Sequence, residues 1–216
     1  MKIISFCNNN SKTGKTTTAF NIAIKFSEKG LKVLAIDTDP KFDLTSMFGI
    51  KDIQSVKDYE LLDKNTKIET VAVNDNLEVI AINTGKRGYG RYKALKNYLL
   101  TLEKYDVIII DTAPSFHEYL PSVLFASDIY VVAKDDWKET IGIKSVIDFA
   151  RDLNKKISGI ILTEKTSKEP SFEAFEKLLD EYQLKTTIKK EGENEKDYND
   201  LAEEIIRIEG LKWKKS

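Results

Sequence analysis

The chain reads Cys7-Asn8-Asn9-Asn10-Ser11-Lys12-Thr13-Gly14-Lys15-Thr16-Thr17-Thr18 between a short apolar run at 2–6 and an amphipathic run at 17–29. The first run predicts a strand. The second predicts a helix, because its apolar side chains recur at helical spacing. A loop that leaves a strand and opens a helix presents backbone amides to an anion. Gly14-Lys15-Thr16 adds a permissive backbone, a cation and a hydroxyl. This context predicts a phosphate-binding loop of the Walker A type.

The loop assigns a role to each of its residues. Lys15 would reach the β- and γ-phosphates, Thr16 would ligate Mg²⁺, and Thr17 would contact the α-phosphate. The first glycine of the G-x-x-x-x-G-K-[ST] pattern is replaced by Asn9, a residue type that tolerates a positive φ. The alternative is a lysine- and threonine-rich turn that only caps a helix. The full set of expected nucleotide-binding residues is Asn10, Ser11, Lys12, Thr13, Gly14, Lys15, Thr16 and Thr17.

The rest of the chain repeats this strand–helix alternation. Apolar runs at 33–36, 77–82, 107–110, 129–133 and 157–162 predict strands, and several are apolar throughout, as in strands covered on both faces. Amphipathic runs at 89–104, 120–126, 138–153, 171–182 and 198–208 predict helices. The expected fold is α/β, a P-loop NTPase fold with a mainly parallel twisted sheet and helices on both faces. Its ligands bind at the carboxyl ends of the strands.

The composition excludes several kinds of chemistry. The chain has 216 residues, with one His and one Cys, Cys7, so it cannot form an internal disulfide or a zinc site with several Cys ligands. We expect Cys7 and His117 to be structural. No apolar run approaches the ~20 residues of a membrane span. The formal net charge is −1, which gives no overall attraction to nucleic acid or membrane. We expect one cytoplasmic domain, 1–216, with a tail at 209–216 that is flexible or partly packed.

Carboxylates follow two other predicted strands. Asp37 and Asp39 end the run at 33–36, and Asp111 ends the run at 107–110 in the manner of a Walker B motif. Asp111 would hold Mg²⁺ through water. The alternatives are a pair of carboxylates that starts a turn before Pro40 and, at Asp111, a helix cap. Because the phosphate loop ends a third strand, we expect all three acids to belong to one site.

With these motifs in place, the chain resembles the ParA/MinD family of P-loop ATPases with a deviant Walker A loop, K-G-G-x-G-K-[ST]-T. The match runs through Gly14-Lys15-Thr16-Thr17 and continues to Ala23. The segment 37–45 is similar to the family's D-x-D-P-Q-x-N-L-T motif, and 111–114 to its D-[TC]-x-P switch. The run at 197–206 resembles the Y-x-x-L-A-x-E-[IL] helix that closes ParA-type chains. The likeness therefore covers the start, the middle and the end of the chain.

The resemblance implies a function and a set of roles. It implies ATP and Mg²⁺ as cofactors, with Asp37 near the Mg²⁺ shell and Asp39 orienting the attacking water. It also implies a homodimer when ATP is bound, binding of non-specific DNA, and a centromere-binding, ParB-like adaptor that stimulates slow hydrolysis. The family's signature lysine, which crosses to the partner's nucleotide, corresponds here to Asn10. Lys12 either takes over that catalytic role or is simply solvated.

A basic stretch is the candidate DNA surface. Between residues 86 and 104 six basic residues face one acid, and tyrosines interleave with them. Such a stretch either tracks a phosphate backbone or forms a solvated helix face. The candidates are Lys86, Arg87, Arg91, Lys93 and Lys96. The segment 191–204 is acidic and would repel DNA. Beside plasmid or chromosome partition, two alternatives remain: a nucleotide-dependent regulatory module with little hydrolysis, and a MinD-type membrane-positioning ATPase, for which the short apolar tail is poorly suited.

Overall fold

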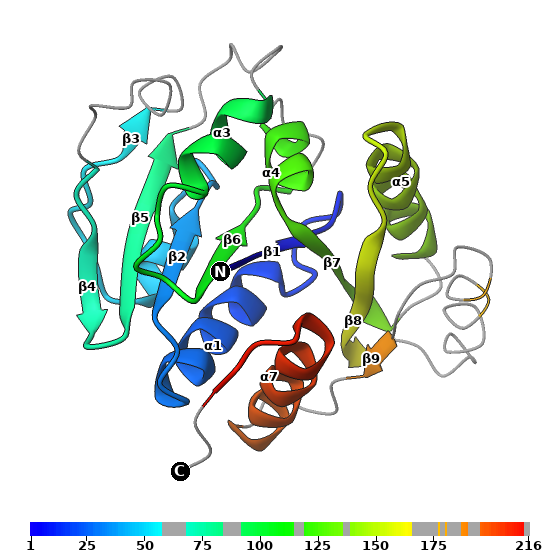
Figure 1. Ribbon diagram of the computed structural model, residues 1–216. Coiled ribbons are helices and arrows are strands. Elements are labelled where there is room, and N and C mark those ends of the chain that lie inside the picture. The colour runs from blue at the N-terminus through cyan, green and yellow to red at the C-terminus, as the bar shows by residue number, and fades with distance from the viewer. Residues whose placement is uncertain are drawn as a thin grey trace.

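The computed structural model describes residues 1–57, 68–83, 92–114, 119–135, 139–165, 177, 180, 187–189 and 195–213 (Figure 1). The strands are β1 (Lys2–Cys7), β2 (Val33–Asp37), β3 (Val56–Lys57), β4 (Val71–Asn74), β5 (Leu77–Asn83), β6 (Val107–Asp111), β7 (Asp128–Asp135), β8 (Ile157–Lys165) and β9 (Thr187–Lys189). The helices are α1 (Lys15–Glu28), α2 (Asp43–Met47), α3 (Tyr92–Leu99), α4 (Leu120–Ala126), α5 (Glu139–Asp152) and α7 (Glu195–Glu209).

Within the described residues these strands form one sheet in the order β3-β5-β2-β6-β1-β7-β8-β9, and β4 adds to β5. All pairings are parallel except that of β4 with β5. β6 lies between β1 and β2 and pairs with both. The fold class predicted from sequence is thus confirmed, and the phosphate loop leaves a central strand.

Helices cover the sheet on both faces, as Figure 1 shows, with α1 and α7 on one side and α3, α4 and α5 on the other. This double cover explains why every residue of β2 and β6 is buried. A strand buried on both faces has no solvent side that would call for alternating polar residues. The unbroken apolar runs in the sequence are therefore a consequence of the layers.

The helix α7 is fixed to the sheet by a buried polar contact. The Tyr130 hydroxyl donates to Glu209 Oε1 over 2.7 Å, and Lys2 Nζ donates to Glu209 Oε2 over 3.1 Å. The Glu209 side chain is 0% exposed. Lys2 also lies 3.5 Å from the carboxylate of Asp128. The last residue of α7 therefore ties β1 and β7 together at their amino ends.

Replacing Glu209 with alanine is expected to lower the free energy of unfolding by about 3 kcal/mol, because the buried Tyr130 hydroxyl and the Lys2 ammonium lose their shared acceptor. Glu203→Ala on the same helix removes the ion pair of a half-exposed carboxylate with Lys29, and should cost about 0.5 kcal/mol. Urea denaturation of both variants measures the difference. Equal losses of unfolding free energy in the two variants would show that the buried contact stabilises the fold no more than the ion pair of Glu203 does.

The sequence located the main elements and missed the minor ones. The helix predicted at 120–126 has those bounds. Of the one predicted at 89–104, residues 89–91 lie outside the described residues, and the helix ends at Leu99, after which the chain turns back toward β6. The predicted helix at 171–182 lies outside the described residues apart from 177 and 180. Strands β3, β4 and β9 and helix α2 were not predicted. They are short, with two to five residues each, so they carry little periodic signal.

None of the helices in the described ranges is long and apolar enough to cross a lipid bilayer. The tail after α7 packs in part on the domain, because Leu211 and Trp213 contact the α1 side of the core. The ammonium of Lys29 lies 4.4 Å from the centre of the Trp213 ring, a cation–π contact. These two apolar side chains are thus held by the domain itself.

Candidate functional site

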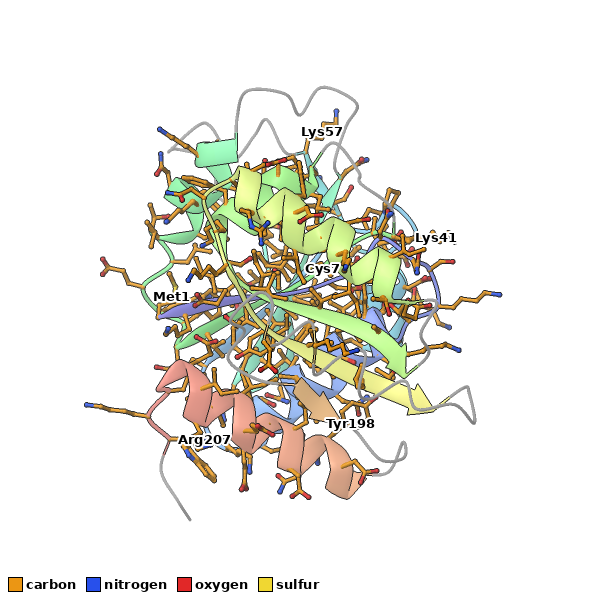
Figure 2. All side chains as sticks on the ribbon, turned by 90° about the vertical axis from the view of Figure 1, so that its right-hand side faces the viewer. Met1, Cys7, Lys41, Lys57, Tyr198 and Arg207 are labelled. Atoms are coloured by element: carbon orange, nitrogen blue, oxygen red, sulfur yellow. The ribbon has the colours of Figure 1, made fainter. Side chains whose placement is uncertain are left out.

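The predicted site residues gather at the carboxyl ends of β1, β6 and β2. Phe6 is level with Asp111, and Asp111 is level with Asp37, in the registers of these three neighbouring strands. Figure 2 shows Met1 and Lys41 at opposite edges of the molecule, with Cys7 in the packed interior between them. The edge near Lys41 is the one toward which these parallel strands run. The loop after β1 and the two acid-bearing strand ends therefore form one site.

The backbone of the phosphate loop turns at two residues with positive φ. Gly14 has φ 92° and stands directly before α1, and Lys12 has φ 60°. A Cβ at Gly14 would lie 3.1 Å from Thr163 Cγ2. The positive φ and this close contact both require glycine here. Asn9 does not adopt a positive φ, so the reason given from sequence for an asparagine there is wrong. The left-handed turn falls three residues later, on Lys12.

Lys15 is buried in the loop, with 5% of its surface exposed. Its Nζ donates to the carbonyl oxygen of Asn10 over 2.8 Å. Burial lowers the pKa of Lys15, and the negative charges of Asp111 and Asp39 act in the opposite direction. A buried ammonium with one carbonyl partner and acids nearby is suited to bind phosphate oxygens, because the phosphate replaces the water that the lysine has lost.

The other residues of the loop differ in their burial and contacts. Thr13 is buried, and its carbonyl accepts a hydrogen bond from the Thr163 hydroxyl over 3.0 Å. Thr16 and Thr17 are half-buried at the start of α1, and the Thr17 carbonyl accepts from the Asn21 amide. Ser11 and Lys12 are exposed at the tip. Lys12 is therefore accessible for contact with a ligand or a second chain, and its role as a replacement for the signature lysine stays a prediction.

The first turn of the loop is held by side chains of its own. The Asn8 amide donates to the carbonyl of Val132 in β7 over 2.8 Å, and the Asn8 side-chain oxygen accepts from the backbone N–H of Asn10. The Asn10 amide donates to Glu139 Oε2 at the start of α5, over 2.9 Å. The residue in place of the family's signature lysine is thus bound within its own chain.

Asp37 lies at the end of β2 with both carboxylate oxygens engaged. One oxygen accepts from the backbone N–H of Asp39 over 3.1 Å, and the other from the N–H and hydroxyl of Thr45, each over 2.9 Å. Burial raises the pKa of Asp37 to about 6, although these hydrogen bonds favour its charged form. A carboxylate that already accepts three hydrogen bonds fits a place near a hydrated Mg²⁺ better than direct ligation.

Asp39 stands in the turn that follows β2. It is 7% exposed, and one of its oxygens accepts from the backbone N–H of Lys41 over 2.9 Å. Between the two acids, the hydroxyl of Thr38 donates to the carbonyl of Asp111 over 2.6 Å, which joins the ends of β2 and β6. Asp37 and Asp39 therefore have different surroundings, as the sequence predicted. Of these two acids, only Asp39 has a carboxylate oxygen that accepts no hydrogen bond from a described residue.

Asp111 gives the test of whether the site fits a metal. Its side chain is 0% exposed, and neither carboxylate oxygen has a hydrogen bond of ordinary geometry with any described residue. Burial raises its pKa well above the ordinary value, as does the charge of Asp37, while the Thr16 hydroxyl acts against the rise. A buried acid without donors is costly unless a cation offsets it. Asp111 and the Thr16 hydroxyl therefore fit Mg²⁺ held directly or through water.

The raised pKa of Asp37 gives a pH dependence with a definite sign. Its folded pKa of about 6 exceeds the ordinary value of 3.8, so between these limits the folded state binds more protons than the unfolded state. The free energy of unfolding must then fall as pH rises from about 4 to about 6, by roughly 2–3 kcal/mol when the full shift is realised.

The measurement is denaturation of the metal-free protein across this range, for wild type and Asp37→Asn. Wild type is expected to lose stability relative to the variant as pH rises, because the variant has no proton to release at this position. If the free energies of unfolding of the two proteins differ by a constant amount from pH 4 to pH 7, the raised pKa of Asp37 is contradicted.

The predicted DNA-binding residues are divided. Lys86, Arg87 and Arg91 lie outside the described residues, whereas Lys93 and Lys96 are on α3. Lys93 is exposed, and the ammonium of Lys96 lies 5.2 Å from the centre of the Phe125 ring. Helix α3 packs beside α4 on the opposite face from α1. The two described candidates thus lie on the helix layer opposite α1, and their part in DNA binding stays a prediction.

Sequence reasoning missed Glu139, Gly142 and Thr163, which shape the loop from outside. Each lies at or after the carboxyl end of a strand: Thr163 is near the end of β8, and the other two lie in the first turn of α5, after β7. The rule that ligands bind at the carboxyl ends of strands pointed to these segments. No motif marked them, because their partners are backbone atoms and asparagines of a loop far away in sequence.

The comparisons with known proteins agree with this geometry. Residues 1–163 match a family described as an AAA domain. A virulence plasmid ParA family protein of Chlamydia psittaci is 30% identical over 179 residues, 76% of this chain and 69% of the relative. The sporulation initiation inhibitor protein Soj of Bacillus subtilis is 29% identical over 182 residues, 75% of this chain and 72% of the relative.

A solved structure of a plasmid partition protein from Borrelia burgdorferi, bound to AMPPNP, is similar along nearly the whole chain. The TM-score is 0.72 with 27% identity, covering 96% of this chain and 97% of that one. The alignments cover between 58% and 72% of the length of the first curated relatives. The matched motifs, the fold and these relatives agree, and the chain therefore belongs to the ParA/MinD family of P-loop ATPases.

Proposed function

We propose that this chain is a partition ATPase that binds ATP with Mg²⁺ and hydrolyses it in the service of plasmid or chromosome segregation. The observation that carries the proposal is a buried lysine, Lys15, close to a buried acid, Asp111, whose carboxylate accepts no hydrogen bond of ordinary geometry from any described residue. The relatives support it: one is a ParA family protein and another, a plasmid partition protein, binds AMPPNP.

The side chains divide the chemistry among themselves. Lys15 and the amides of the loop bind and orient the β- and γ-phosphates. Thr16, Asp111 and, through water, Asp37 hold Mg²⁺, which when bound offsets the negative charge that gathers on the phosphates. Asp39 has an oxygen available to orient a water molecule in line with the γ-phosphate. Catalysis in such a site comes from positioning and electrostatics, and Lys12 would add a positive charge at its mouth.

The finer parts of the proposal follow the family. The ATP-bound chain would form a homodimer, bind non-specific DNA and respond to a ParB-like adaptor that speeds slow hydrolysis. It would act in the cytoplasm, associated with the nucleoid while bound to DNA. The exposed positions of Ser11 and Lys12 at the loop tip support a contact between two loops.

The direct test is steady-state ATP hydrolysis by the wild type and by Lys12→Ala, with and without non-specific duplex DNA. We expect hydrolysis that depends on Mg²⁺ and that Lys12→Ala lowers by about tenfold or more, since a charge near the transferred phosphate is lost. Lys51→Ala, an exposed lysine after α2, is the control and should hydrolyse ATP at the wild-type rate. A wild type that binds no MgATP would refute the proposal.

DNA binding is tested separately by filter retention at increasing salt. The double variant Arg91→Glu/Lys93→Glu is expected to lose most of the ATP-dependent retention, because phosphate contacts dominate non-specific affinity. Lys156→Glu, an exposed lysine just before β8, reverses one charge elsewhere and should retain DNA. Retention that is the same in the double variant and in wild type would remove this stretch from the DNA surface.

One observation favours a second candidate, a nucleotide-dependent binding module with little hydrolysis. Asn10 cannot supply positive charge, and its side chain is bound to Glu139 in the same chain. In that case MgATP would bind and drive dimerisation while hydrolysis stays near the background level in wild type and Lys12→Ala alike. Measuring the dimer by light scattering together with phosphate release separates the two candidates.

A further inference from the structure

The first residue of α5 contacts the nucleotide loop from outside. We propose that Glu139 is a positioning residue of the phosphate loop: its carboxylate holds the Asn10 side chain against α5, and so fixes the backbone carbonyl on which Lys15 rests. This inference rests on the proposed nucleotide site, and it adds a determinant that none of the loop motifs contains.

The hydrogen bonds form a continuous path from α5 to the lysine. Glu139 Oε2 accepts from the Asn10 amide over 2.9 Å, and the Asn10 carbonyl accepts from Lys15 Nζ over 2.8 Å. The backbone N–H of Asn10 donates to Asn8, which is itself bound to Val132 of β7. A hydrogen bond to a charged acceptor is stronger than one between neutral groups. Glu139 therefore supplies the only charged acceptor among these contacts of the first turn.

The shape of α5 supports the same role. Gly142 lies one turn after Glu139, and a Cβ there would approach Asn10 Nδ2 to 2.9 Å and Asn8 Oδ1 to 3.0 Å. Residues three apart in a helix share a face. The two loop asparagines therefore lie on a helix surface where a glycine makes room and a carboxylate supplies the acceptor. An accidental surface contact would not need both.

Charge and hydrogen bonding at Glu139 act in opposite directions on phosphate binding. The carboxylate is near enough to Lys15 to favour its charged form and to raise its pKa, although burial is the larger effect and lowers that pKa. Toward a bound phosphate, the same negative charge is repulsive. A role in positioning therefore predicts that removing the charge and removing the acceptor have different results.

The experiment measures the affinity of the full chain for AMPPNP with Mg²⁺ by calorimetry. Glu139→Gln keeps an acceptor for Asn10 without the charge, and is expected to bind as tightly as wild type or several-fold more tightly. Glu139→Ala and Asn10→Ala remove the contact and should each bind about tenfold more weakly, the effect of one charge-assisted hydrogen bond. The double variant Asn10→Ala/Glu139→Ala should bind no more weakly than either single variant.

Two further variants guard against a general loss of structure. Asp152→Ala removes an exposed acid at the far end of α5 and should leave the affinity unchanged. Gly142→Ala leaves Glu139 in place but pushes on both asparagines, and should weaken binding as Glu139→Ala does. Urea denaturation without nucleotide checks that each variant is folded at the assay temperature.

The outcomes separate the inference from the proposed function. Wild-type affinity in Glu139→Ala, equal weakening in Glu139→Gln and Glu139→Ala, or additive losses in the double variant would each overturn the positioning role while the nucleotide site stands. A wild type that binds no AMPPNP would remove the proposed function and this inference together. Tight binding by Glu139→Gln with coupled losses in the alanine variants is the result that supports it.

Discussion

Replacing Lys15 with methionine is expected to reduce ATP hydrolysis at least 100-fold and to weaken nucleotide binding at least tenfold. Lys15 is the one cation that the structure places inside the loop, buried and bound to the Asn10 carbonyl within the described residues. Lys12, the other lysine of the loop, is exposed at its tip and does not replace this buried charge. The loss of one such group in a water-poor site costs about 10²–10³ in rate.

Methionine is chosen because it keeps most of the aliphatic length of lysine. Burying an ammonium is costly, so Lys15→Met is expected to leave the free energy of unfolding unchanged or to raise it slightly. Lys25→Met is the matched control, since Lys25 is similarly buried on the same helix but at the far end, paired with Glu28. Hydrolysis by Lys25→Met should equal that of wild type. Comparable hydrolysis by the two variants would refute the assigned role of Lys15.

Asp111→Asn is expected to change activity and stability in opposite directions. Hydrolysis should fall by about 100-fold or more, because the metal loses a negative partner at the end of β6. The metal-free protein should become more stable at pH 8, by about 1 kcal/mol, because a neutral group replaces a buried carboxylate that accepts no hydrogen bond of ordinary geometry from any described residue. Phosphate release and urea denaturation in a chelator measure the two effects.

The opposite end of the same strand provides the control. Asp106, just before β6, accepts a hydrogen bond from the backbone N–H of Lys32, so Asp106→Asn should cost some stability and leave hydrolysis intact. A destabilised Asp111→Asn, or one that hydrolyses ATP at the wild-type rate, would show that Asp111 is a structural residue. Only a ligand-binding acid explains a gain in stability together with a loss of activity.

The sequence predicted those site residues that lie at the ends of apolar strands. Lys15, Asp37 and Asp111 each end a buried apolar strand or open the helix behind one, and a parallel sheet brings such ends together. The role of Asn9 was misjudged, because φ values depend on how the whole loop closes. Here the left-handed turn falls on Lys12, where sequence gave no reason to expect it.

The residues that sequence reasoning could not find are those whose importance depends on a distant contact. Glu139 reads as an ordinary first-turn acid of a helix, and Gly142 as a weak point within it. Both residues matter for the site only because Asn8 and Asn10, some 130 residues earlier in the chain, pack against that turn of α5. No spacing of residues in the sequence indicates the hydrogen bond between Asn10 and Glu139.

The attachment of α7 has a consequence for the order of events during synthesis. α1 precedes α7 by most of the sheet, and its buried side chains Ile22 and Phe26 belong to the same core cluster as Leu201 and Ile205 of α7. A ribosome must therefore make all the strands between the two helices before α7 can cover this apolar face of α1. Until then the face is available to chaperones or to other nascent chains. Shortened chains that lack α7 should accumulate in aggregates although their nucleotide loop is intact.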